Sequence, residues 1–457
     1  MATGVRSEVN PIEPGSALEG RAVTVLEIDS IATGGDGVGR DTTGRVVFVP
    51  GTAPGDRVRV RIVDARKRWA RAELVEIQQP GPGRREPPCP LYGECGGCAL
   101  QHLEIEAQRE AKRTIIREAL KRIGGITLDL APIASAGKEF GYRNRVTLTL
   151  RRGPEGVRMG YRERRDPAAV LDVADCPLAE EPVRRALREL RTDWGNGARH
   201  LPDGQELKIT IRCTEDGDVG LHVRGGDPGH PGDPDAVASS VTALASYVWT
   251  RDDGTRQVLA GSASLTDRWQ GTRFELAPES FLQVNRDVSR LMDGTLDEWV
   301  GPRRGVRIAD LYAGAGARAI RWAREGASVT AVESDPEAVE SGLKAAAAEG
   351  LQLEFIASRV ESAAESYANA DIIVVNPPRA GLSDAVVDTL LTPRPARGLA
   401  YVSCDPATLG RDLSRLSGVW HPAVVRGCDA FPQTAHVETL VWMERGGYEG
   451  SRETEAA

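Results

Sequence analysis

Gly305-Val-Arg-Ile308-Ala-Asp310-Leu-Tyr312-Ala-Gly314-Ala-Gly316 indicates a buried strand, a glycine-rich turn and the start of a helix. Glycine in such a turn lets the backbone approach a ligand closely. Further predicted strands follow at 328–333, 372–375, 399–402, 420–426 and 438–443. Because strands alternate with helical segments, the sequence from about residue 278 predicts a doubly wound, Rossmann-like α/β domain. Ligands of such domains bind at the carboxyl ends of the strands.

The glycine turn favours a nucleoside ligand without a pyrophosphate. A pattern of two glycines alone is weak, and it also fits dinucleotide binding or simple packing. The third glycine of the dinucleotide pattern is missing, since Ile320 and Arg321 occupy its region. Glu333 ends the next strand, where a carboxylate can accept the ribose hydroxyls. S-adenosylmethionine therefore fits best, and Asn376-Pro377-Pro378 supports it, because such turns hold a target base near the methyl donor in many methyltransferases.

The run 399–402 leads into Ser403-Cys404-Asp405-Pro406 and a predicted helix at 407–416. A thiol facing a helix N-terminus is expected to have a lowered pKa, as a nucleophile needs. Most lone cysteines are buried structural residues, so the rest of the chain has to decide. We expect the carboxylate of Asp405 to point away from Cys404, because a negative charge beside the sulfur would raise the thiol pKa.

Glu438 opens the last predicted strand, so its carboxylate can reach a site shared with Cys404. Thiol and carboxylate are the pair needed to methylate carbon-5 of a pyrimidine. That carbon becomes nucleophilic after a thiolate adds to carbon-6, and a base then removes the carbon-5 proton. A base embedded in nucleic acid has to be flipped out for this chemistry.

Three of the seven cysteines form the pattern C-x5-C-x2-C, namely Cys89, Cys95 and Cys98. An odd cysteine count argues against a disulfide framework. Zinc would require a second close pair of ligands, and the radical-type cluster that opens S-adenosylmethionine has a different spacing. Cys176, followed by proline, is the remaining candidate in this half of the chain, so a cubane iron–sulfur cluster fits better. Cys213 is expected in the core of a strand.

Composition sets the broad class of the protein. The chain has 457 residues, with 40% hydrophobic and 27% charged residues, typical of a globular protein with about two to four domains. No secretory signal or membrane-length apolar run is visible, so we expect a cytoplasmic location. The net charge of −8 speaks against nucleic acid, but arginines cluster at 57–71 and 151–165, which favours local polyanion binding.

The N-terminal part predicts a small β-barrel of the oligonucleotide-binding type, with strands at 21–28, 45–49, 56–63 and 71–76. Trp69 could stack on a base or plug the barrel. A helix is predicted at 103–123, and strands at 146–150, 156–161, 169–173, 207–213 and 219–223 predict a β-rich central region.

Nearly the whole chain resembles the RNA uridine-5-methyltransferase family, in its branch with a TRAM domain and a 4Fe-4S cluster. The resemblance rests on the cysteine pattern with Gln101-His-Leu, Tyr142-Arg-Asn-Arg, Asp175-Cys-Pro-Leu, Ser280-Phe-Leu-Gln-Val-Asn, Asp310-Leu-Tyr-x-Gly-x-Gly, Ser403-Cys-Asp-Pro-Ala-Thr-Leu and Phe431-Pro-Gln-Thr-Ala-His-Val-Glu. It implies Cys404 as nucleophile and Glu438 as base. It also implies a cluster on Cys89, Cys95, Cys98 and Cys176, and a cofactor and base pocket with Gln283, Asp310, Tyr312, Gly314, Gly316, Glu333 and Asn376.

The residue patterns and the resemblance together predict a domain plan. It consists of a disordered leader at 1–18, a TRAM barrel at 19–77, a cluster-bearing central domain at 78–102 and 126–270, a methyltransferase domain at 103–125 and 271–446, and a disordered tail at 447–457. We expect a monomer that acts on RNA. Two residues depart from the family: Asn376 stands where Asp is common, and Ala317 stands where some members have Asn.

Two other functions fit parts of the sequence. Asn-Pro-Pro also occurs in exocyclic-amine methyltransferases, but these favour an aromatic residue after the prolines, where this chain has Arg379. A non-catalytic, cluster-bearing RNA-binding protein would explain the barrel and the cysteines but not the Cys404 and Glu438 pair. Between ribosomal and transfer RNA as substrates, the TRAM-plus-cluster plan favours ribosomal RNA.

Overall fold

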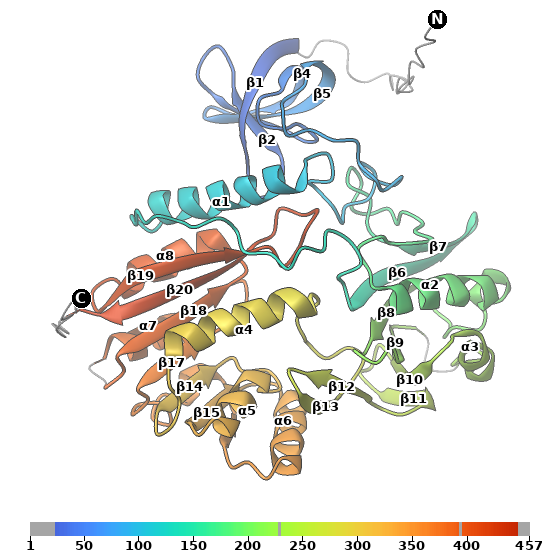
Figure 1. Ribbon diagram of the computed structural model, residues 1–457. Coiled ribbons are helices and arrows are strands. Elements are labelled where there is room, and N and C mark those ends of the chain that lie inside the picture. The colour runs from blue at the N-terminus through green and yellow to red at the C-terminus, as the bar shows by residue number, and fades with distance from the viewer. Residues whose placement is uncertain (1–22, 227–229, 393–394, 447–457) are drawn as a thin grey trace, which may run out of the picture. The chain divides into compact units, whose positions relative to one another are not determined.

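The computed structural model describes residues 23–226, 230–392 and 395–446, and the chain divides into two compact units between Arg84 and Arg85 (Figure 1). The segments predicted to be disordered, 1–18 and 447–457, lie outside the described residues. Among the helices of the described ranges, none is both long and apolar enough to cross a membrane.

The first unit is a closed barrel with the strand order β1-β2-β3-β5-β4. Its strands are β1 (Val23–Ile31), β2 (Gly37–Arg40), β3 (Val46–Val49), β4 (Arg57–Ala65) and β5 (Trp69–Gln79). The predicted barrel is confirmed, but no strand was predicted at β2. Its glycines serve packing, because a Cβ at Gly37 would lie 2.0 Å from the Oγ1 atom of Thr52.

A fully buried carboxylate, Asp56, closes the barrel. Its oxygens accept hydrogen bonds from the backbone N–H groups of Ala53 and Gly81, each at 2.7 Å. The guanidinium of Arg84 pairs with it at 3.0 Å. The proline- and glycine-rich segment after β5 therefore belongs to the barrel, because it satisfies a charge that the barrel buries.

The central sheet of the second unit has the order β11-β10-β9-β8-β6-β7. It contains β6 (Arg145–Gly153), β7 (Gly156–Gly160), β8 (Glu206–Cys213), β9 (Val219–Arg224), β10 (Leu244–Thr250) and β11 (Arg256–Gly261), with helices α2 (Glu181–Asp193) and α3 (Pro234–Ser240). Cys213 is buried in this core, as predicted.

The prediction of a strand at 169–173 is wrong. This segment makes an isolated bridge between Arg162 and Val170, and the N–H groups of Leu171 and Val173 donate to β7 and its end. The N–H of Met159 donates to the side chain of Asp172 at 2.8 Å. The side chain of Asp172 thus accepts a hydrogen bond that a backbone carbonyl would accept in a sheet. The regular pairing with β7 therefore does not continue along 169–173.

The second sheet of this unit is the predicted doubly wound sheet, in the order β16-β15-β14-β17-β18-β20-β19. Strands β14 to β18 run parallel, and β20 runs antiparallel to both β18 and β19. Its strands are β14 (Arg307–Leu311), β15 (Ser328–Glu333), β16 (Glu354–Ala357), β17 (Ile372–Val375), β18 (Gly398–Ser403), β19 (Trp420–Cys428) and β20 (Glu438–Arg445). Its helices are α4 (Arg286–Val300), α5 (Ala317–Arg324), α6 (Pro336–Ala348), α7 (Asp384–Leu391) and α8 (Pro406–Leu416). The parallel strands all end at one edge, which positions the site described below.

A hairpin of β12 (Leu265–Trp269) and β13 (Thr272–Leu276) packs against α5 and α6. Its turn falls at residues 270 and 271, where the domain plan drawn from the sequence puts a boundary. Buried apolar side chains of the hairpin share one cluster with Ile320 of α5 and Ala345 of α6. The hairpin therefore covers one end of the doubly wound sheet.

Helix α1 (Ile105–Arg122) lies against α8, beside the doubly wound sheet (Figure 1). Ile116 and Leu120 share a core cluster with Leu409 and Leu413. On the same helix Lys112 is fully buried and pairs with Asp429, which is also fully buried. Burial lowers the pKa of Lys112, and the carboxylate of Asp429 opposes that shift.

We predict that Lys112→Met strongly destabilises the second unit, because it leaves the carboxylate of Asp429 buried with its main cation removed. Breaking one partner of a buried pair costs about 3–5 kcal/mol of the free energy of unfolding. Denaturant unfolding followed by circular dichroism measures this loss. Lys121→Met is the matched control on the exposed side of the same helix, and it should change stability by less than about 0.5 kcal/mol. Equal effects of the two variants would contradict the prediction.

Candidate active site

A cavity of about 700 Å³ lies at the carboxyl ends of β14, β15, β17 and β18. Every residue predicted for catalysis or cofactor binding lines it. These residues are Gln283, Asp310, Tyr312, Gly314, Gly316, Glu333, Asn376, Cys404 and Glu438. The structure thus brings together side chains that are up to 155 residues apart in sequence, from 283 to 438.

Strand register sets Cys404 opposite Glu438. Ser403, the last residue of β18, pairs with Thr439 of the antiparallel strand β20. Continuing this register by one residue reaches Cys404 on one strand and Glu438 on the other. Successive side chains alternate between the faces of a sheet, so both residues project to the same side, and both line the cavity.

Asp405 caps the helix that follows Cys404. One oxygen of its carboxylate accepts a hydrogen bond from the N–H of Thr408 at 2.8 Å, and Pro406 begins α8. The hydroxyl of Ser403 accepts a bond from the N–H of Asp405 at 3.1 Å and fixes the turn. The capping role agrees with the expectation that this carboxylate points away from the sulfur.

The expectation that the helix N-terminus lowers the pKa of Cys404 is wrong. Burial raises the pKa of this half-buried thiol, and the nearby Glu438 raises it further. The guanidinium of Arg379 opposes both effects. Burial and the charge of Glu438 therefore outweigh the cation in setting the pKa of Cys404.

Glu438 is 4% exposed, and burial raises its pKa to about 7, with Arg379 acting in the opposite direction. Arg379 thus borders both reactive groups. It follows the Pro377-Pro378 turn at the end of β17, and its carbonyl accepts a hydrogen bond from Thr408 of α8 at 3.1 Å. The sequence analysis noted Arg379 only because an aromatic residue is absent at that position. A cation directly after the Pro377-Pro378 turn could have indicated that Arg379 lies in the site.

The glycine turn is tied to Glu333. One carboxylate oxygen accepts a bond from the N–H of Gly314 at 2.9 Å, and the other accepts from the N–H groups of Ser334 at 2.6 Å and Asp335 at 2.9 Å. Gly316 has a positive φ of 69°, and a Cβ there would lie 2.2 Å from the ring of Phe355. Glycine at this position is therefore required by both backbone shape and packing.

Beneath the cavity, Asp310 and Asp293 share the guanidinium of Arg318, at 3.2 Å and 3.0 Å. Asp310 is 1% exposed, and burial raises its pKa to about 6 against the effect of Arg318. Asp310 was predicted to bind the cofactor. In the structure it borders the cavity while paired with a cation that the sequence analysis did not consider.

The sequence from Glu279 to Trp299 predicts one helix, but α4 begins only at Arg286. The side chain of Asn285 caps it by accepting a hydrogen bond from the N–H of Val288 at 3.2 Å. The segment before it is a loop held by the central sheet. Arg145 donates to the carbonyls of Glu279 and Ser280 at 3.1 Å and 3.0 Å. These carbonyls bond to a side chain instead of to the N–H groups of a helix. The loop that follows borders the cavity through Phe281 and Gln283.

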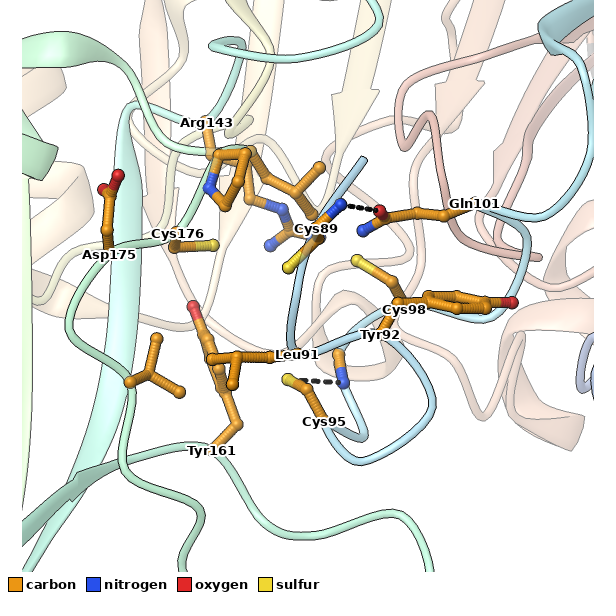
Figure 2. A pocket seen from close by; sticks show the side chains of 14 residues that line it. Cys89, Leu91, Tyr92, Cys95, Cys98, Gln101, Arg143, Tyr161, Asp175 and Cys176 are labelled. Carbon is orange, nitrogen blue, oxygen red and sulfur yellow. Dashed lines mark hydrogen bonds between the residues drawn. The ribbon is translucent and has the colours of Figure 1, made fainter. Parts of the chain in front are cut away.

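The four cysteines predicted to hold a cluster line one separate cavity of about 170 Å³ (Figure 2). The sulfur atoms of Cys89, Cys95, Cys98 and Cys176 face a shared space, and none forms a disulfide. Burial raises the pKa of Cys98 to about 12 and raises those of Cys95 and Cys176. Within 23–226, 230–392 and 395–446, no group of three or more His, Cys, Asp or Glu side chains is arranged to hold a metal ion.

Many arginines of the two basic segments are paired within the fold. On the barrel, Arg59 pairs with Glu76 at 3.2 Å and Arg61 with Glu73 at 3.9 Å. In the second unit, Arg151 and Arg162 both pair with Glu206 at 2.7 Å. The acids that neutralise them come from other strands, which a count along the sequence does not reveal. These pairs weaken the case for a purely arginine-based polyanion surface.

Trp69 lies outside the apolar cluster that fills the barrel and is half-buried. Its ring meets Phe48 edge to face with centroids 6.5 Å apart, and the guanidinium of Arg71 lies 5.9 Å from the ring centroid. Of the two roles considered for Trp69, a plug of the barrel core is therefore excluded. An accessible aromatic ring beside a cation suits stacking on a base.

Comparisons with known proteins agree with this arrangement. Residues 17–75 match the TRAM domain, and residues 258–446 match the tRNA (Uracil-5-)-methyltransferase family. An uncharacterized RNA methyltransferase of Thermosynechococcus vestitus is 34% identical over 92% of this chain and 98% of its own. The 23S rRNA (uracil(1939)-C(5))-methyltransferase RlmD of Chromohalobacter salexigens is 34% identical over 92% of this chain and 89% of its own.

Among solved structures, the Pyrococcus abyssi tRNA (uracil-54, C5)-methyltransferase, in complex with S-adenosyl-L-homocysteine, is similar with a TM-score of 0.70 and 25% identity. The match covers 92% of this chain and 100% of that one. The shared fold thus includes the barrel, the central sheet and the doubly wound sheet.

We predict that alkylation of Cys404 by iodoacetamide titrates above the ordinary thiol pKa of 9.0. Glu438→Gln should move the titration to lower pH because a negative charge is removed, and Arg379→Gln should move it to higher pH because a positive charge is removed. Peptide mass spectrometry across a pH series measures the rate at Cys404, with the buried Cys213 as the internal control. Shifts of the two variants in the same direction would contradict this electrostatic account.

Proposed function

This chain belongs to the RNA (uracil-5-)-methyltransferase family, and we propose that it methylates carbon-5 of a uridine in large-subunit ribosomal RNA through a covalent adduct at Cys404. The observation that carries the proposal is the pairing of a thiol and a carboxylate across one strand register, beside the glycine turn. Two relatives named as 23S rRNA enzymes, at 34% and 33% identity, favour ribosomal RNA over transfer RNA.

Cys404 serves as the nucleophile in this proposal. Its thiolate adds to carbon-6 of the uracil, and the ring gains the electron density that carbon-5 needs. Because burial raises the pKa of Cys404, the thiol has to lose its proton within the site, and Arg379 is the cation that favours the thiolate. When bound, S-adenosyl-L-methionine supplies the electrophilic methyl group.

Glu438 serves as the base. After methyl transfer its carboxylate takes the proton from carbon-5, the ring double bond re-forms, and the carbon–sulfur bond breaks with its electron pair on Cys404. A carboxyl group with a pKa of about 7 is suited to this step, because it is a much stronger base than an exposed glutamate and still ionises near neutral pH.

The cofactor side of the cavity is assigned to Gln283, Asp310, Tyr312, Gly314, Gly316 and Glu333, and the target-base side to Asn376. In Asn376 an amide replaces the common carboxylate, so it can both donate and accept hydrogen bonds to a uracil edge. Glu333 already accepts three backbone bonds, which orders the turn and leaves part of its capacity for ribose hydroxyls.

An exocyclic-amine methyltransferase fits the site less well. Such a reaction needs neither a thiol nor a carboxylate base, and this cavity has both. A binding protein without catalysis would likewise have no use for the paired Cys404 and Glu438.

We also propose that Cys89, Cys95, Cys98 and Cys176 hold a 4Fe-4S cluster. In favour of it, four thiols that form no disulfide border a single cavity, and an all-sulfur donor set suits iron–sulfur chemistry. Asp175 also borders this cavity, but its carboxylate accepts a hydrogen bond from Arg184 at 2.8 Å. A cluster there would cross-link the 89–98 loop to the segment at 176 and would make the high thiol pKa values irrelevant, because bound sulfurs are deprotonated.

We predict that Cys404→Ala lowers methyl transfer by at least about a thousandfold, since the covalent route needs the thiolate. The measurement is incorporation of labelled methyl groups into undermethylated 23S rRNA, with transfer RNA as the competing substrate. Wild-type protein should prefer the ribosomal RNA.

Cys213→Ala controls for loss of a buried cysteine away from the cavity. Retained activity in Cys404→Ala would refute the covalent mechanism, and a preference for transfer RNA would refute the substrate assignment while leaving the mechanism in place.

Anaerobically purified protein is expected to be brown and to contain about four iron atoms per chain, as a cubane cluster requires. Iron analysis and visible absorption measure this, and Cys176→Ser should lose most of the iron because one thiolate ligand is gone. Stoichiometric zinc without iron would exclude the cluster.

A further inference from the structure

The loop between β19 and β20, residues 429–437, ends at Glu438 and is mostly buried. Its central residue, Gln433, is 0% exposed and has a φ of 72°. Residues other than glycine adopt this left-handed conformation at a cost, so the surroundings have to hold it. The contacts of Gln433 show what holds this loop.

The backbone of Gln433 is bonded to the cysteine loop. Its carbonyl accepts hydrogen bonds from the N–H groups of Ala99 at 3.1 Å and Leu100 at 3.0 Å. Ala99 directly follows Cys98, which borders the smaller cavity. The N–H of Gln433 donates to the side chain of Gln108 in α1 at 2.8 Å.

The side chain of Gln433 extends the same connection. Its carbonyl oxygen accepts from the side chains of Gln108 and Arg85, both at 3.0 Å. Arg85 also donates to the carbonyl of Gln101 at 3.2 Å, and the side chain of Gln101 accepts from the N–H of Cys89 at 3.1 Å. A continuous set of buried or half-buried hydrogen bonds therefore links Cys89 and Cys98 to Gln433.

The two cavities also share a wall. Arg143 borders the cysteine cavity, and its guanidinium lies 5.7 Å from the ring centroid of Phe431, which borders the cavity of Cys404. The hydroxyl of Tyr142 donates to the carbonyl of Pro432 at 3.0 Å. The loop that leads to Glu438 is thus fixed at three consecutive residues, 431 to 433, by segments that border the cysteines.

We propose that Gln433 is a positioning residue that couples the filled cysteine cavity to the placement of Glu438. The proposal rests on the proposed function, in which Glu438 removes the carbon-5 proton. A 4Fe-4S cluster on the four thiols, as proposed above, would hold the cysteine loop in place. This loop is bonded to Gln433, which directs the chain toward β20 and Glu438. With the cavity empty, the loop loses this support and proton removal slows.

The test separates proton removal from adduct formation. Gln433→Gly keeps the left-handed backbone, the two bonds to its carbonyl and the bond from its N–H to Gln108. It removes only the bonds that the side chain of Gln433 accepts from Gln108 and Arg85. We expect adduct formation within about twofold of wild type and release slowed by at least about tenfold, since only the last step needs the base in place. Methylated protein–RNA adduct should then accumulate on denaturing gels, with a larger isotope effect from carbon-5 deuterium.

Gln352→Gly, in an exposed loop, is the matched control and should behave like wild type. Gln433→Asn keeps an amide and tolerates the backbone conformation, so it should accumulate less adduct than the glycine variant. Turnover by Gln433→Gly without adduct accumulation, or an equal loss of adduct formation and release, overturns the proposal.

Hydrogen–deuterium exchange tests the coupling without any RNA. In wild-type protein, chelation of the metal should raise exchange in residues 429–437 by at least about fivefold, whereas in Gln433→Gly exchange should be high before and after. Unchanged exchange in wild type overturns the proposal, as does purified protein without metal. If wild type methylates no RNA, the proposed function fails, and this measurement still decides whether the two regions are coupled.

Discussion

The antiparallel pairing of β18 with β20 is the constraint on which the candidate site depends. These strands are joined through α8 and β19, yet their register ends with Ser403 opposite Thr439. The next residue on each strand carries the reactive group. A thiol and a carboxylate that are 34 residues apart, from 404 to 438, are therefore set side by side by backbone hydrogen bonds rather than by flexible loops.

Electrostatics then limit how the two groups can be used. Burial raises the pKa of both Cys404 and Glu438, and each negative charge disfavours the other, while Arg379 favours both. One negative charge beside Arg379 is thus better tolerated than two. In the proposed reaction the second negative charge is short-lived, because methyl transfer neutralises the enolate that the thiolate forms before the carboxylate takes up a proton.

Sequence patterns predicted the doubly wound sheet and the barrel, because apolar periodicity and glycine turns are local signals. Other residues of the main cavity, such as Gln283 and Tyr312, were predicted only from the family resemblance. The patterns failed where contacts distant in sequence decide the outcome. Strand β2 was missed because its two glycines are required by close contacts with Thr52 and with the backbone of Glu27. Helix α4 begins late because Arg145 binds the carbonyls of the preceding loop. The pKa of Cys404 could not be foreseen, since it depends on burial and on Glu438 and Arg379, which come from other strands.

The hydrogen bonds around the buried carboxylate of Asp56 define where the N-terminal unit ends. The buried carboxylate is satisfied by Ala53, Gly81 and Arg84, all within that unit. A truncation at residue 77 would remove two of these partners, whereas a cut after Arg84 would leave the buried charge fully compensated. The first unit therefore neutralises the charge that it buries with its own residues, and its functional boundary lies after Arg84 rather than at the end of the last barrel strand.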